Sequence, residues 1–189
     1  MATNDGPDKN MDDPAWRLEQ VLPEFRSIHT ERLRRLFVHT YERIEGQDRD
    51  ILTDSIFGLH ETHEPGPGSL TPVSGSVLID HVDCVEPRDL DIGINAGYLD
   101  RYDDDAYVAA IARLLARAIL RHLSTFSPFL IIAEHHDLEI QQQARVHQWD
   151  ADCQVWLWGF GPELRALWKA NGEAEPPWYH QFDPDPGPQ

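Results

Sequence analysis

The stretch from Asp103 to Leu123, DDDAYVAAIARLLARAILRHL, predicts one long helix. Three acids open it, where an N-cap and the positive end of the helix dipole favour negative charge. It contains no Pro or Gly, and the Ala, Leu and Arg that dominate it are strong helix formers. Apolar residues recur at spacings of three and four, which places one face in a core. This face carries Val108, Ile111, Leu115 and Ile119, together with His122.

A second face of this helix carries a positive stripe. Arg113, Arg117 and Arg121 are four residues apart and therefore lie one above another. A guanidinium binds a carboxylate through two parallel hydrogen bonds, so the stripe is a candidate site for an anion or a protein partner. Two other interpretations stay open. The stripe is a solvated face, or it forms an internal salt bridge with Asp150 or Asp152.

Aromatic residues form a second candidate interface. Trp149, Trp156, Trp158 and Trp168 crowd one region, and Trp178 follows ten residues later. Core packing explains most of such a run. Exposed Trp side chains are favoured at protein interfaces, so Trp158 and Trp178 are predicted to contribute to partner binding.

The length and apolar content predict a folded protein with tails. The chain has 189 residues, of which 41% are hydrophobic, which is enough for one domain with its own core. We predict a disordered tail over residues 1–13, a single domain over 14–172 and a Pro-rich tail over 173–189.

The pattern of elements predicts an α+β class: a mostly helical domain around a small β-hairpin or sheet. Two short strands are expected, over residues 76–85 and 90–95, and they pair as a hairpin if both form. Helices are expected from Pro14, over 24–45, over 48–59 with an end at Gly58, over 103–123 and over 162–170. The segment 134–147 is compatible with a helix, and 149–158 is a helix or a buried segment.

The charge balance disfavours nucleic acids and anionic membranes as partners. The net charge is −17, whereas nucleic acids and anionic membranes require a basic surface. No run of 18 apolar residues occurs, and the polar N-terminal stretch is unlike a signal peptide. Two Cys do not make a disulfide framework. We therefore expect a cytoplasmic protein that binds neither nucleic acid nor membrane.

Several segments in order resemble the zinc metallopeptidase-like domain that is encoded with MoxR ATPases and von Willebrand factor A proteins. They are IGINAGYL (92–99), LLARAILRHL (114–123), the pair His135-His136, and the run that begins WDADC at Trp149. The resemblance covers about residues 76–170. It implies a zincin-like core and membership of a larger assembly, with an AAA-type ATPase or a von Willebrand A protein as partner.

The sequence departs from that family where its chemistry should lie. The family's helix carries HExxH, whose two His bind zinc while the Glu takes a proton from bound water. The corresponding positions here are Arg117, Ala118 and Arg121. Arg stays protonated and cannot bind a cation, and Ala has no basic group. The resemblance therefore implies a degenerate metallopeptidase-like protein without catalytic residues or cofactor, acting as a protein-binding or scaffold component.

Two other functions stay open. A metal-dependent hydrolase would use zinc held by His122, His135, His136 and Asp152. An acidic inhibitor or nucleic-acid mimic would instead concentrate its Asp and Glu side chains on one surface. A further histidine motif, HETH at residues 60–63, is one residue short of a zinc helix motif and is predicted to lie in a loop.

Overall fold

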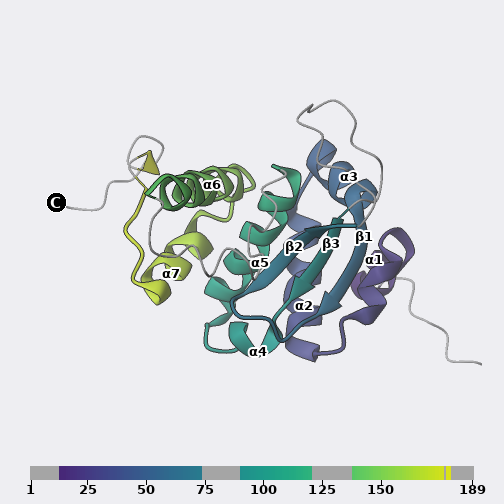
Figure 1. Cartoon of the computed structure of the whole chain (residues 1–189). Helices are drawn as coiled ribbons and strands as arrows, with labels where there is room; N and C mark the ends of the chain where they lie inside the picture. Colours follow the sequence, from purple (N-terminus) through teal and green to yellow (C-terminus); the bar gives the residue numbers. More distant parts are fainter. Residues whose placement is uncertain (1–12, 74–89, 121–137, 177, 180–189) are drawn as a thin grey trace, which may run out of the picture. The chain divides into compact units, whose positions relative to one another are not determined.

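The computed structural model describes residues 13–73, 90–120, 138–176 and 178–179. These residues form seven α-helices, one short 3-10 helix and a three-stranded sheet (Figure 1), which confirms the mostly helical α+β class. The chain divides into two compact units, Met1–Tyr98 and Leu99–Gln189. The domain predicted over residues 14–172 spans both units, which are described in turn.

The first unit holds the sheet. Its strands are β1 (Ile56–Glu61), β2 (Gly68–Pro72) and β3 (Leu90–Ile94). The central strand β3 runs parallel to β1 and antiparallel to β2. The strand predicted over 90–95 is thus confirmed as β3, whereas its predicted hairpin partner over 76–85 lies outside the described residues. The buried face of the sheet carries Leu59, Leu70 and Ile92.

The helix predicted over 48–59 is only partly correct. Helix α3 (Gly46–Ser55) ends three residues before Gly58, and the chain then enters β1. Ile56 and Leu59 are buried and pair with β3, so the contacts of the sheet override a local pattern that fits either structure. The prediction that His60 and Glu61 lie in a loop is wrong for the same reason, because both belong to β1.

The N-terminal helices also correct one prediction. Helix α1 (Pro14–Val21) begins as predicted, and the Asp13 carboxylate accepts a hydrogen bond from the Ala15 N–H at 2.9 Å. The single helix predicted over 24–45 is divided into a 3-10 helix η1 (Pro23–Ser27) and α2 (Glu31–Arg43). Figure 1 shows α2 running behind the sheet. Between the two helices, Ile28 and Thr30 adopt extended backbone conformations.

Glu61 at the end of β1 stabilises the extended segment between η1 and α2. Its Oε1 accepts hydrogen bonds from the backbone N–H groups of His29 and Thr30, both at 2.6 Å, and its Oε2 accepts one from the Thr30 hydroxyl at 2.7 Å. The N–H groups at a helix start have no partner within the helix. Burial by itself would raise the pKa of Glu61, but these hydrogen bonds outweigh it and lower the pKa.

Replacing Glu61 by Gln is expected to lower the free energy of unfolding by about 1 kcal/mol at neutral pH, the typical contribution of a helix cap. The folded-state pKa of Glu61 is lowered, so this stability is fully present above the unfolded-state value and is lost as the pH falls through the folded-state pKa. The difference in the free energy of unfolding between wild type and variant, measured by urea unfolding, should become smaller as the pH falls below 4.5, the ordinary pKa of a Glu carboxyl. The exposed control Glu64→Gln should show no such difference at neutral pH or below pH 4.5.

The second unit consists of three described helices that pack together: α5 (Asp104–Ile119), α6 (Leu138–Leu157) and α7 (Gly161–Asn171). The short helix α4 (Ala96–Leu99) lies at the boundary between the units. The two segments predicted over 134–147 and 149–158 form one helix where they are described. Helix α7 agrees with its prediction, since Pro162 lies in its first turn and Gly172 follows its last residue with a φ of 65°.

The central helix α5 confirms the predicted element. Asp103 is its N-cap, and the carboxylate accepts a hydrogen bond from the Ala106 N–H at 2.9 Å. Residues 121–123 of the predicted helix lie outside the described residues. Buried Ala residues along α5 permit close packing against α6 and α7, which contribute larger side chains such as Val155, Leu164 and Trp168.

Candidate functional site

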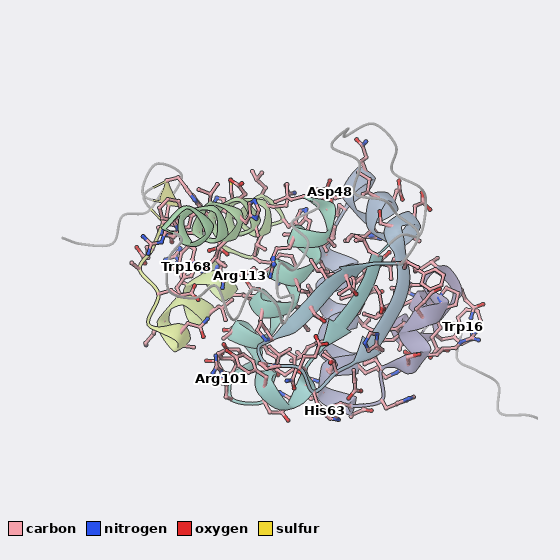
Figure 2. All side chains as sticks on the ribbon, in the orientation of Figure 1. Trp16, Asp48, His63, Arg101, Arg113 and Trp168 are labelled. Atoms are coloured by element: carbon pink, nitrogen blue, oxygen red, sulfur yellow. The ribbon has the colours of Figure 1, made fainter. Side chains whose placement is uncertain are left out.

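The predicted stripe on α5 provides two described guanidinium groups, those of Arg113 and Arg117. They lie one helical turn apart, yet their surroundings differ. Figure 2 shows Arg113 on α5 and Trp168 on α7. The candidate site consists of these two arginines, the carboxylates of α6 and of the segment after α7 that accept hydrogen bonds from Arg113, and the side chains of α6 and α7 that bind those carboxylates.

Arg113 forms a two-pronged ion pair with Asp152 of α6. Its Nε donates to Oδ1 at 2.6 Å, and its Nη2 donates to Oδ2 at 3.1 Å. The side chain of Asp152 is only 1% exposed and that of Arg113 only 15%. Parallel hydrogen bonds of this kind are among the strongest between charged groups. The internal salt bridge that the sequence left open is therefore present, and Arg113 forms it.

A second carboxylate meets the same guanidinium. Glu173 accepts from Arg113 Nη2 at 2.9 Å and from Nη1 at 3.4 Å. The side-chain amides of Gln148 and Asn171 each donate to Glu173 at 2.8 Å. Tyr102 extends the network by donating to the Asn171 carbonyl oxygen at 2.6 Å. The side chain of Arg113 is thus committed to groups of its own chain.

Gly172 brings Glu173 to this position. Its left-handed backbone, with a φ of 65°, turns the chain at the end of α7, and the Glu173 N–H donates to the Trp168 carbonyl at 2.9 Å. Such a glycine turn is a common end of a helix. Tyr179, in the Pro-rich segment predicted over residues 173–189, is 2% exposed.

Trp168 completes the surroundings of Asp152. Its indole N–H donates to Oδ2 at 2.9 Å, in a buried position. Burial raises the pKa of Asp152, although Arg113 and this hydrogen bond act in the opposite direction. Burial alone would lower the pKa of Arg113, but Asp152 and Glu173 raise it above its ordinary value. The guanidinium is therefore held in its charged form.

Arg117 has a different environment. It is half-buried, and among the residues that the structure describes it has neither a hydrogen bond nor an ion pair. Burial lowers the pKa of its guanidinium, and the positive charge of Arg113 lowers it further. A guanidinium withdrawn from water without a counter-charge is costly. Of the two described arginines of the stripe, Arg117 is therefore the one without a counter-charge in the described part of the chain.

The other predicted site residues are placed as follows. Trp158 is half-buried at the end of α6. Trp178 packs edge-on against Trp168, with ring centroids 6.4 Å apart, and Tyr179 meets both Trp168 and Trp156 edge-on. Roles for Trp158 and Trp178 in partner binding stay predictions. The remaining residues, Arg121, His122, His135 and His136, lie outside the described part of the chain.

Of the four residues predicted to bind zinc, Asp152 is the one that the structure describes. Both of its carboxylate oxygens accept hydrogen bonds within the chain. Across residues 13–73, 90–120 and 138–179, with 177 left aside, no group of three potential ligands is close enough to hold a metal ion. His60 of the short histidine motif contacts Asp91 through its Nδ1 at 3.2 Å on the sheet. Zinc binding through the three predicted histidines stays a prediction.

Sequence reasoning missed Gln148, Trp168 and Glu173 as members of the site. The sequence pattern predicts a tail at Glu173, and it marks Trp168 only as one of several aromatic residues. One signal for Glu173 was present: an acid directly after the Asn171-Gly172 helix end is returned toward the last turn of that helix when Gly adopts the left-handed conformation. Gln148 carried no comparable signal.

Comparison with protein-family models, with curated proteins and with solved structures finds no match to this chain. The resemblance to the metallopeptidase-like family therefore depends on the sequence pattern alone. Among the helices that the structure describes, none combines the length and the apolar character needed to cross a lipid bilayer.

Proposed function

We propose that this protein is a non-catalytic, protein-binding component of a larger assembly, and that Arg117 receives a carboxylate of its partner. The supporting observation is the contrast between two arginines on one helix. Arg113 is paired with two carboxylates of its own chain, whereas Arg117 is half-buried without a counter-charge among the described residues. A carboxylate from a partner would supply that charge.

The departures from the metallopeptidase pattern support the non-catalytic part of the proposal. In the register of the resemblance, Arg117 and Ala118 occupy positions where zinc chemistry needs a ligand and a base. The proposal keeps an AAA-type ATPase or a von Willebrand A protein as the partner class, because the resemblance implies these proteins. The partner surface should present Asp or Glu, since the group offered to it is a guanidinium.

The proposal predicts that Arg117→Met removes partner binding. Truncating one member of a buried charge pair costs about 2–5 kcal/mol, so affinity should fall at least about thirtyfold. The tagged full-length chain would be incubated with an extract of its source cells, and bound proteins would be quantified by mass spectrometry. One protein should be enriched by the wild type and depleted with Arg117→Met.

The matched control is Arg145→Met, which removes an exposed arginine of α6 and the same net charge. It should bind the partner as the wild type does. Equal loss in both variants would show that overall charge, rather than Arg117, governs binding. The metal content of the purified wild type is a separate check: stoichiometric zinc that survives dialysis would contradict the proposal and favour the hydrolase interpretation.

A further inference from the structure

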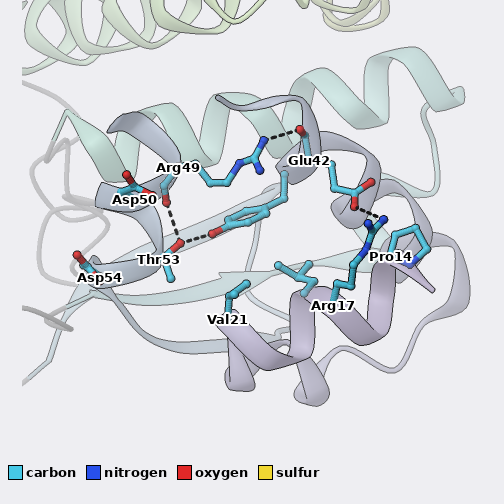
Figure 3. Close-up of a pocket in the computed structure, with 10 residues that line it drawn as sticks. Pro14, Arg17, Val21, Glu42, Arg49, Asp50, Thr53 and Asp54 are labelled. Carbon is cyan, nitrogen blue, oxygen red and sulfur yellow. Dashed lines mark hydrogen bonds and ion pairs between the residues drawn. The ribbon is translucent and has the colours of Figure 1, made fainter. Parts of the chain in front are cut away.

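The first unit contains a groove between α1, α2 and α3, with a volume of about 580 Å³. Apolar side chains of Leu18, Val21 and Tyr41 line part of it, and Asp50 and Asp54 line the α3 side. Figure 3 shows these two acids on α3, across the groove from Pro14 and Arg17 on α1. The volume lies in the range typical of ligand sites.

The two arginines that line the groove already bind groups of their own chain. Arg17 pairs with Glu42, with Nη2 and Oε1 3.3 Å apart. Arg49 directs its guanidinium at two backbone carbonyls. Its Nε lies 2.5 Å from the Ile44 oxygen, and its Nη2 lies 2.7 Å from the Glu42 oxygen (Figure 3). Neither arginine thus forms an ion pair with the acids of α3 among the residues that the structure describes.

Asp50 and Asp54 are four residues apart and therefore lie on one face of α3. Both are exposed, and neither forms an ion pair with a residue in the described part of the chain. Two like charges at this spacing repel each other, so a cation bound between them removes an unfavourable interaction as well as adding a favourable one. The α3 side of the groove therefore carries two negative charges that have no ion-pair partner in the described part of the chain.

The apolar part of the groove limits what that cation is. Val21 is 51% exposed beside buried Leu18. The Tyr41 hydroxyl is held by Thr53, whose own hydroxyl donates to the Arg49 carbonyl at 2.8 Å, and Tyr41 is only 3% exposed. Val21 therefore provides the exposed apolar surface of the groove. A small inorganic cation would leave this surface exposed to water. A Lys or Arg side chain covers apolar surface with its stem and presents charge at its tip.

We propose that the groove between α1 and α3 binds a basic segment of a partner protein, with an Arg side chain reaching Asp50 and Asp54 and an apolar neighbour packing on Val21. Charge complementarity favours this occupant over a second copy of the chain. The chain carries 33 Asp and Glu against 16 Lys and Arg, so two copies repel each other. This site is separate from Arg117 and requires the opposite charge in its partner.

The test uses the full chain and a short fluorescein-labelled peptide in which Leu and Arg alternate, with binding followed by fluorescence anisotropy. The double variant Asp50→Asn/Asp54→Asn should weaken binding about tenfold or more. The matched control Glu45→Gln/Glu64→Gln removes the same charge from exposed positions that do not line the groove. It should retain affinity within about twofold, apart from long-range attraction that salt screens.

Two further binding measurements test the role of the apolar surface of the groove and the type of cation that it binds. Val21→Ser should weaken the Leu–Arg peptide but not a peptide in which Ser replaces Leu. Spermidine, a flexible small cation, should compete poorly with the Leu–Arg peptide. Equal losses in the two double variants would overturn the proposal by assigning binding to overall charge. Undiminished binding by Val21→Ser, or effective competition by spermidine, would overturn the assignment of a protein segment.

Discussion

Replacing Arg113 by Met is expected to lower the free energy of unfolding by about 3–5 kcal/mol, the usual cost of removing one partner of a buried ion pair. Met keeps most of the apolar stem, so the loss comes from the charge. Asp152, whose side chain is 1% exposed, would retain the Trp168 N–H but lose both hydrogen bonds from Arg113. Glu173 would face it without a cation between them. Urea unfolding at neutral pH, followed by circular dichroism, measures the change.

Arg117→Met is the matched control, because it makes the same replacement one turn further along α5. It removes a half-buried guanidinium whose pKa is lowered by burial and by Arg113. We therefore expect the free energy of unfolding to stay the same or to rise by up to about 1 kcal/mol. If both variants lose several kcal/mol, the stability depends on the packing of the arginine stems and not on the ion pair with Asp152.

A double variant tests whether Arg113 and Asp152 stabilise each other. Asp152→Asn in the Arg113→Met background removes the buried charge that the single variant leaves without a cation. Part of the lost stability should therefore return, with a coupling free energy of about 0.5–3 kcal/mol between the two positions. Additive losses would indicate that the two side chains do not stabilise each other.

The central helix could be predicted because its determinants are local. The acids at its start, the absence of Pro and Gly, and the recurrence of Val108, Ile111 and Leu115 all concern neighbours within a few turns. The sheet could not be predicted in the same way. Strand β1 pairs in parallel with β3, so Leu59 meets Ile92 across more than 30 positions of sequence. A short segment with both helical and strand character is decided by such distant contacts.

The candidate site shows the same limit. From the sequence, the arginines of the stripe are equivalent, and Asp150 and Asp152 are equal alternatives as partners. The packing of α6 against α5 separates them, because it buries Asp152 and leaves Asp150 exposed. Glu173 enters only because the chain turns at Gly172. The distinction between Arg113, which is paired, and Arg117, which has no counter-charge in the described part of the chain, therefore depends on tertiary structure.

Phe37→Ala is expected to lower the free energy of unfolding of the first unit by about 3–5 kcal/mol, the usual cost of truncating a buried Phe. The ring is fully buried in α2. It stacks between Phe25 of η1 and Tyr41 of α2, with ring centroids 5.5 and 6.2 Å away. Its loss would leave a cavity between η1 and α2, which are joined only by a short extended segment. Circular dichroism during urea unfolding measures the change.

The matched control is Phe57→Ala, which deletes the same side chain from a position on β1 that is 54% exposed. Its expected effect is within about 0.5 kcal/mol. Trp16 is the only Trp within residues 1–98, so its fluorescence, isolated by replacing the other five with Phe, reports on this unit. Phe37→Ala should shift the Trp16 transition to lower urea, and Phe57→Ala should leave it in place. A similar shift in both variants would mean that the aromatic stack around Phe37 does not stabilise the unit beyond what an exposed ring contributes.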